Sequence, residues 1–194
     1  AESLRTDEFR ALVAGARGTA LGAMPLFPTG RFGLVYTAVL ARPQHTDLPL
    51  DMVCGLTDRV QAVMEPSSVA VVRSWAGRMP DALAVLRAWG YDYAGHFVVP
   101  TTTPRTSAWF EELHDVALVG LRGRPTAPLA SYRIRSVPTN ATCRETLDQV
   151  CPGQPKLELY AESETEGWTT WRQDDLVVAP VPAPSEERAI RVRS

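Results

Sequence analysis

The chain has 194 residues, of which 45% are hydrophobic and 22% are charged, and its formal net charge is -2. A chain of this size and composition can form one globular domain with a sizeable core. The sequence lacks the clear positive excess with which strongly basic proteins neutralise phosphates. Charge alone therefore does not predict nucleic-acid binding.

The cysteines and the apolar stretches exclude several classes of protein. Cys54, Cys143 and Cys151 form no Cys-x-x-Cys pair and lie beside no histidine cluster, which predicts reduced, packed thiols without a zinc site or a disulfide framework. No apolar stretch approaches the length of a membrane span, and the first residues lack the apolar core of a signal peptide. We therefore expect a cytoplasmic or nuclear protein that is not secreted and binds no metal.

Strand and helix patterns alternate along the first half of the chain. They predict a short helix over 6–13, a buried strand over 31–40, helical spacing over 48–64, a second buried strand over 68–75, and an amphipathic helix over 80–89 with Pro80 in its first turn. This order is β-α-β-α, which is typical of a parallel sheet covered by helices.

The second half of the chain continues the alternation. It predicts a short strand over 97–99, a polar loop over 100–107 that could move, a strand over 116–121 followed by a turn, a helix over 144–151 and a strand over 156–161. We expect an α/β fold with a mostly parallel sheet flanked by helices. The expected domains are an N-terminal helix and lead-in over 1–29, a main domain over 30–178, and a Pro/Arg-rich tail over 179–194 that is extended or disordered.

Three segments resemble one family in their order and spacing. They are residues 83–93 with Trp89-Gly90 (preceded by Trp75 at a strand end), residues 113–123, and the stretch from Pro152-Gly153 through 156–161 to Trp168 and Trp171. Together they resemble the adenine-N6 methyltransferases of the mRNA-adenosine and bacterial β-class type. The resemblance covers about residues 30–178 and implies a Rossmann-like S-adenosylmethionine-dependent methyltransferase fold. In an alternative interpretation, these tryptophans are only packing aromatics.

The catalytic tetrapeptide of that family is missing. In the family, an Asp-Pro-Pro-Trp sequence at a strand end accepts the hydrogens of the adenine amino group and stacks on the base, so that catalysis depends on positioning. The alignment places Ala38, Val39, Leu40 and Ala41 at this tetrapeptide. None of these side chains accepts a hydrogen bond or stacks, so the resemblance implies that the chain has no catalytic residues.

The segments that hold the methyl donor in the family are altered too. The family's His-Ser-x-Lys-Pro segment falls near Thr139 and Asn140, and its Gly-Asn-Glu or Gly-Asn-Gln sequence is replaced by Arg172, Gln173 and Asp174. The resemblance therefore implies that this chain binds no cofactor and that S-adenosylmethionine is bound by an active partner.

A retained scaffold with a lost site favours one function over two alternatives. The resemblance implies a non-catalytic subunit that forms a heterodimer with an active adenine-N6 methyltransferase subunit and supports methylation of DNA or RNA. The alternatives are a stand-alone α/β binding module and a diverged active enzyme. His114, although followed by Asp115, is interpreted as a structural residue at a strand start, because no Ser or Cys nucleophile motif is present.

A cluster of arginines gives a candidate nucleic-acid groove. Arg122, Arg124, Arg133 and Arg135 fall within a short stretch, and alternate residues of a strand share a face, so Arg133 and Arg135 would point together. In the alternative interpretation, these arginines form salt bridges with a partner or are solvated. Glu158 lies in the middle of a predicted strand and could face either side of the sheet.

Overall fold

The computed structural model describes residues 27–41, 49–106, 109, 111–125, 136–137 and 142–172. These residues belong to one compact unit, Phe27–Gln173. The predicted helix over 6–13 lies outside the described residues, as does the predicted tail over 179–194. The predicted domain bounds at 29/30 and 178/179 therefore stay predictions.

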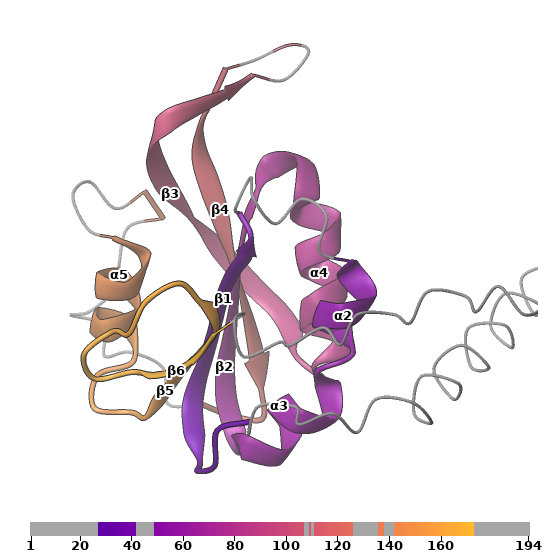
Figure 1. Ribbon diagram of the computed structural model, residues 1–194, viewed down its shortest axis with the longest axis vertical. Helices are drawn as coiled ribbons and strands as arrows, with labels where there is room; N and C mark the ends of the chain where they lie inside the picture. Colours follow the sequence, from indigo (N-terminus) through magenta and orange to yellow (C-terminus); the bar gives the residue numbers. More distant parts are fainter. Residues whose placement is uncertain are drawn as a thin grey trace, which may run out of the picture. The chain divides into compact units, whose positions relative to one another are not determined.

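Within the described residues, one six-stranded sheet forms the centre of this unit (Figure 1). Its strands are β1 (Phe32–Leu40), β2 (Met64–Trp75), β3 (Asp92–Thr106), β4 (Glu111–Arg122), β5 (Lys156–Ala161) and β6 (Thr169–Arg172). They lie in the order β3-β4-β2-β1-β5-β6. β1 is parallel to β2 and β5, and β5 is parallel to β6, whereas β4 is antiparallel to β2 and β3. Only β4 is reversed among these described strands, which confirms the predicted mostly parallel sheet.

Helices cover both faces of the sheet (Figure 1). One face carries α2 (Leu50–Cys54), α3 (Thr57–Val63) and α4 (Met79–Ala88), and α4 contacts β2, β3 and β4. The opposite face carries α5 (Cys143–Val150), and the short 3-10 turn η2 (Ala76–Arg78) leads from β2 into α4. The predicted α/β class with flanking helices is confirmed. No helix in the described part of the chain is long and apolar enough to cross a membrane.

Three elements differ from the sequence-based prediction. The helical spacing over 48–64 forms two helices, because the chain turns at Gly55 after α2, and Met64 already begins β2. β6 was not predicted, since only four residues form it. The prediction of a loop over 100–107 is wrong for residues 100–106, which belong to β3 and pair with β4 up to Thr106.

The extension of β3 through a Pro/Thr-rich sequence has a physical reason. β3 is the edge strand, and its outer side carries the Val98 amide, which donates to the carbonyl of Ser136 at 2.7 Å. Two residues later, Pro100 falls on the same outer side, where β4 requires no amide donor. Threonine is β-branched and favours extended backbone. The polar residues and the proline at the end of β3 are therefore typical of an edge strand and not of a loop.

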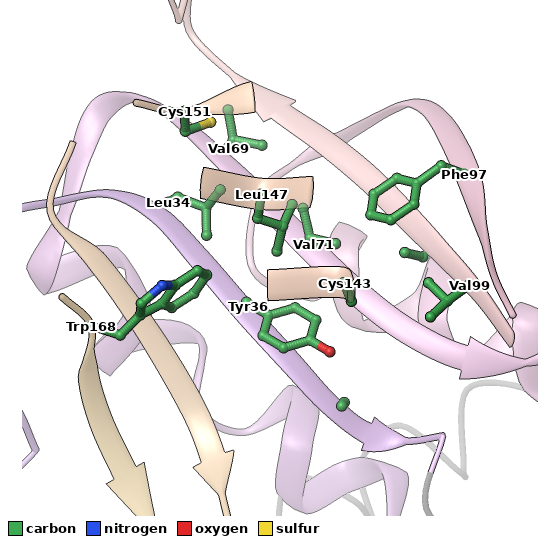
Figure 2. Close-up of a cluster of buried hydrophobic side chains, with 12 residues drawn as sticks. Leu34, Tyr36, Val69, Val71, Phe97, Val99, Cys143, Leu147, Cys151 and Trp168 are labelled. Carbon is green, nitrogen blue, oxygen red and sulfur yellow. The ribbon is translucent and has the colours of Figure 1, made fainter. Parts of the chain in front are cut away.

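The sheet face under α5 carries a continuous apolar cluster (Figure 2). Alternate residues of β1, β2 and β3 supply Leu34, Tyr36, Val69, Val71, Phe97 and Val99, and α5 with the chain that follows it supplies Cys143, Leu147 and Cys151. Figure 2 shows Leu147 and Cys143 pointing from α5 onto this face. The alternate strand residues that face α5 thus pack against one apolar side of that helix.

The Trp-Gly element at the end of α4 ends that helix and anchors it. The Gly90 amide donates to the Arg87 carbonyl and the Tyr91 amide to the Leu86 carbonyl, with Gly90 at φ 82°, which is a Schellman cap that favours glycine. The Trp89 side chain is fully buried and its Nε1 donates to the Val53 carbonyl at 3.0 Å. This pair therefore ends α4 and holds it against α2.

Candidate functional site

The topology of the sheet points to one edge as the place for a site. From β1 the chain passes to β2 on one side, and later returns to β5 and β6 on the other side. The strand order therefore reverses between β1 and β5. Open α/β sheets bind ligands outside the carboxyl ends of the strands at such a switch point. The carboxyl ends of β1 and β5 thus define the candidate site.

The structure places the predicted degenerate tetrapeptide at this switch point. Ala38, Val39 and Leu40 are the last residues of β1, and Ala41 follows directly. All four are buried, and the Val39 amide donates to the Thr37 hydroxyl at 3.3 Å. The end of β1 therefore offers only apolar side chains at the place where the family's tetrapeptide would lie.

A charged bracket from three other strands closes over the end of β1. We use the name bracket for Arg73 of β2, Arg105 of β3 and Asp115 of β4. Arg73 contacts one carboxylate oxygen of Asp115 through Nη2 at 2.6 Å and through Nε at 2.8 Å. Arg105 donates to the other carboxylate oxygen and also to the Ala41 carbonyl. We call Ala38 to Ala41 the quartet. The carbonyl of its last residue, Ala41, thus already accepts a hydrogen bond from Arg105.

Burial of the bracket is uneven. The Asp115 side chain is buried, whereas Arg73 and Arg105 are each 25% exposed. Two cations share one carboxylate, so the group carries a net charge of +1 (two positive charges and one negative). Buried charge requires such pairing, since a lone carboxylate out of water is costly. Asp115 therefore acts as a structural anion.

A second ion pair lies beside the first on the α5 side of the sheet. Glu158 of β5 is fully buried and faces Arg144 of α5, which settles the two orientations left open for this residue. The guanidinium binds the carboxylate in a fork, with Nε to Oε2 at 2.9 Å and Nη2 to Oε1 at 2.7 Å. The sequence-based prediction contained neither this pair nor the bracket.

A phenol and a thiol lie between the two ion pairs. The Tyr36 hydroxyl and the Cys143 thiol lie in the same apolar cluster and influence each other's pKa, and both groups interact electrostatically with Arg73 and Glu158. Burial raises the pKa of Tyr36 well above its ordinary value and raises the pKa of the Cys143 thiol to about 11. Both groups are therefore neutral near pH 7, and Cys143 is a packed thiol with no thiolate to act as a nucleophile.

Aromatic side chains fill the end of β5. Tyr160 has φ 57°, an unfavourable backbone conformation for an aromatic residue. Its ring packs edge-on against Trp171 of β6 with a centroid distance of 5.4 Å, and Trp171 also contacts Phe27. Burial raises the pKa of Tyr160 to about 12. The positive φ therefore directs this ring into a buried aromatic cluster at the carboxyl end of the strand.

Of the positions predicted for the donor site, the structure describes one. Arg172 is the last residue of β6, and its Nη2 contacts Glu164 Oε1 at 2.9 Å. Thr139, Asn140, Gln173 and Asp174 lie outside the described residues. Among the residues that are described, no three His, Cys, Asp or Glu side chains gather as metal ligands.

The four arginines predicted to form a groove have different surroundings. Arg122 donates through Nη2 to the carbonyls of Met64 and Glu65, at 3.1 and 2.8 Å, and lies over the Tyr91 ring. These contacts account for Arg122 without a nucleic acid. Arg124 is exposed in the turn after β4, and Arg133 and Arg135 lie outside the described residues. The groove stays a prediction.

The tryptophans that contribute to the resemblance have packing roles. Trp89 and Trp171 are buried, and Trp168 lies edge-on to Tyr36 while its Nε1 donates to Asp148 at 3.1 Å. Lys156 also contacts Asp148, at 3.2 Å. These contacts show that the aromatics stabilise the fold, as the alternative interpretation requires, and they are equally compatible with a shared ancestral scaffold.

No model of a protein family matches the chain, and no curated protein matches it significantly.

Proposed function

We propose that this chain is a non-catalytic, pseudo-methyltransferase subunit with a Rossmann-like methyltransferase fold. It pairs with an active adenine-N6 methyltransferase subunit and supports N6-adenine methylation of DNA or RNA. The proposal draws on the ordered resemblance over about residues 30–178. The mostly parallel sheet with helices on both faces is compatible with it.

The closed end of β1 is the observation that carries the proposal. Transfer of a methyl group to an adenine amino group requires an acceptor that holds the amino hydrogens in line with the donor. Here the quartet from Ala38 to Ala41 is apolar and buried, and the Ala41 carbonyl already accepts from Arg105. An adenine at this switch point would find no side-chain acceptor in the quartet.

The residues that contribute to the resemblance also support the proposal, because their roles are structural. Trp89, Gly90 and Trp171 have roles in helix capping and packing that do not depend on catalysis. A subunit that is needed for its shape retains such residues while its site is free to change. The pattern therefore favours a subunit maintained for contact with a partner.

We expect the isolated chain to show no saturable binding of S-adenosylmethionine up to millimolar concentration. The physical reason is that apolar and aromatic side chains occupy the carboxyl ends of β1 and β5. Isothermal titration calorimetry measures this directly, with an active adenine-N6 methyltransferase as the positive control. A micromolar isotherm from the isolated chain would contradict the expected result.

The pairing itself is tested with a partner that has lost its own catalytic group. We expect the chain to raise the methylation rate of an active subunit, and we expect no activity when the aspartate of that subunit's Asp-Pro-Pro-Trp sequence is replaced by alanine. Methyl incorporation into an adenine-containing oligonucleotide is the measurement. Activity in the complex with the inactivated partner would refute a non-catalytic role for this chain, and failure to bind any such subunit would favour the stand-alone module.

A further inference from the structure

The helix α5 is held on the sheet mainly by polar contacts. Arg144 forms the forked ion pair with the buried carboxylate of Glu158. Asp148 accepts a hydrogen bond from Trp168 Nε1 at 3.1 Å and contacts Lys156 Nζ at 3.2 Å. Polar contacts of this kind contribute little net free energy to closure, because both partners bind water again when the two surfaces separate.

The apolar part of this interface is small. Cys143, Leu147 and Cys151 are the buried apolar side chains that α5 and its C-terminal cap bring to the cluster, and Leu147 is the one large side chain among them. On the opposite face of the sheet, α4 buries Leu86 together with the Trp89 ring at its C-terminal end, and Trp89 also donates to the backbone of α2. Burial of apolar surface is the main term that resists separation. The sheet is therefore covered less firmly by α5 than by α4.

The chain after α5 has a fixed point and, just before it, a residue about which the helix can turn. The Gly33 amide of β1 donates to the Pro155 carbonyl at 3.0 Å, which fixes the chain next to β5. Gly153, two residues earlier, has φ 69°, and a Cβ atom added there would meet no atom of the described residues within 4 Å. Glycine adopts both signs of φ readily. A change of backbone conformation at Gly153 can therefore move α5 while Pro155 stays in place.

We propose that α5 is a lid that opens as a unit while the sheet remains folded, and that the ion pair between Arg144 and Glu158 sets how often it opens. We use the name lid for residues 143–151. Opening exposes the apolar cluster on β1 and β2 to water and releases the Glu158 carboxylate from burial. Hydration of the two charged groups then offsets part of the free energy that is lost when the cluster is exposed. The lid thus controls solvent access to this face, and it does not depend on a methyltransferase role.

Two thiols at the two ends of the lid report its opening. Cys143 and Cys151 are 3% and 5% exposed, and they stand about two helical turns apart. The rate at which excess iodoacetamide alkylates each thiol in the folded protein, divided by the rate in the unfolded chain, gives an opening constant. We expect the two thiols to give the same constant, at least about tenfold larger than the unfolding constant measured in urea. Peptide mass spectrometry assigns each label and separates both thiols from Cys54, which is partly exposed.

Ala70→Cys supplies a matched reference on the other face of the sheet. Ala70 is fully buried in β2 opposite Gly120, where an added Cβ would meet Leu86 of α4, so its side chain lies under α4 and not under the lid. We expect this thiol to react only through global unfolding. Hydrogen exchange at the Trp89 amide, which donates to the Val85 carbonyl of α4 at 3.0 Å, gives the same reference in the unaltered chain. Opening constants at the lid thiols no larger than these references would overturn the lid.

Two variants test the role of the ion pair in the same experiment. Arg144→Met leaves Glu158 unpaired in the closed lid but hydrated in the open lid, so the opening constant should rise about thirtyfold or more at both thiols. Arg144→Met combined with Glu158→Leu should return the constant to that of the unaltered chain or below, because an apolar side chain gains no favourable hydration on opening. An increase at Cys143 with none at Cys151 would show fraying of the first turn and overturn opening as a unit. An unchanged constant in Arg144→Met would overturn control by the ion pair.

Discussion

Replacing Arg144 with methionine is expected to lower the free energy of unfolding by about 2–4 kcal/mol, below the full range found when one partner of a buried ion pair is removed, because Arg144 is itself 33% exposed. Glu158 is fully buried and receives two charge-assisted hydrogen bonds from Arg144. The variant leaves this carboxylate without its partner inside the sheet. Methionine retains an apolar side chain of similar length, so the loss reports mainly on charge and hydrogen bonding. Urea unfolding of the full chain, followed by circular dichroism, is the measurement.

Two further variants test whether the loss of stability comes from the unpaired buried charge and not from removing any ion pair. Glu164→Gln removes the ion pair with Arg172 on an 84% exposed side chain, and we expect a loss within about 1 kcal/mol. The double variant Arg144→Met with Glu158→Leu should recover most of the lost stability, since a buried pair replaced by apolar residues is often neutral. A loss for Arg144→Met no larger than that for Glu164→Gln would show that the pair contributes little.

Most of the fold could be predicted where a pattern is local. The strands β1 and β5 are short apolar runs, and α4 has a proline in its first turn. α5 begins with a capping box in which Thr142 and Glu145 satisfy each other's backbone amides. Each of these signals depends on neighbouring residues, which is why the sequence was sufficient.

The elements that were missed depend on contacts between distant segments. β3 extends to Thr106 because Arg105 and Thr106 still pair with β4, and β6 forms because it pairs in parallel with β5. Neither element has an apolar run that marks its ends. The extent of an edge strand is set by its partner, and the sequence of the strand itself does not contain that information.

The position of the quartet could be predicted from the sequence, but the ion pairs around it could not. Ala38, Val39 and Leu40 end β1, as their place in the strand predicted over 31–40 indicates, whereas the bracket was not predicted. Arg73 in an apolar strand and Glu158 in another did signal a need for partners, since a buried charge is costly when unpaired. Their partners, Asp115 and Arg144, are brought to them only by the sheet order.

Replacing Asp115 with asparagine is expected to lower the free energy of unfolding by about 2–4 kcal/mol, somewhat less than for a pair buried on both sides, because the two arginines are partly exposed and can reach water. The variant keeps the size of the side chain and removes the charge that holds Arg73 and Arg105 together. Since Arg105 ties the outer end of β3 to Asp115 and to the Ala41 carbonyl, hydrogen exchange at the backbone amides of Arg105 and Thr106 should accelerate more than exchange in β1, which locates the effect at the outer end of β3. The matched control is Asp81→Asn, because Asp81 pairs with Arg78 nearer the surface, and its expected loss is within about 1 kcal/mol. Equal losses for the two variants, with unchanged exchange at the outer end of β3, would show that the bracket neither stabilises the sheet nor orders the end of this strand.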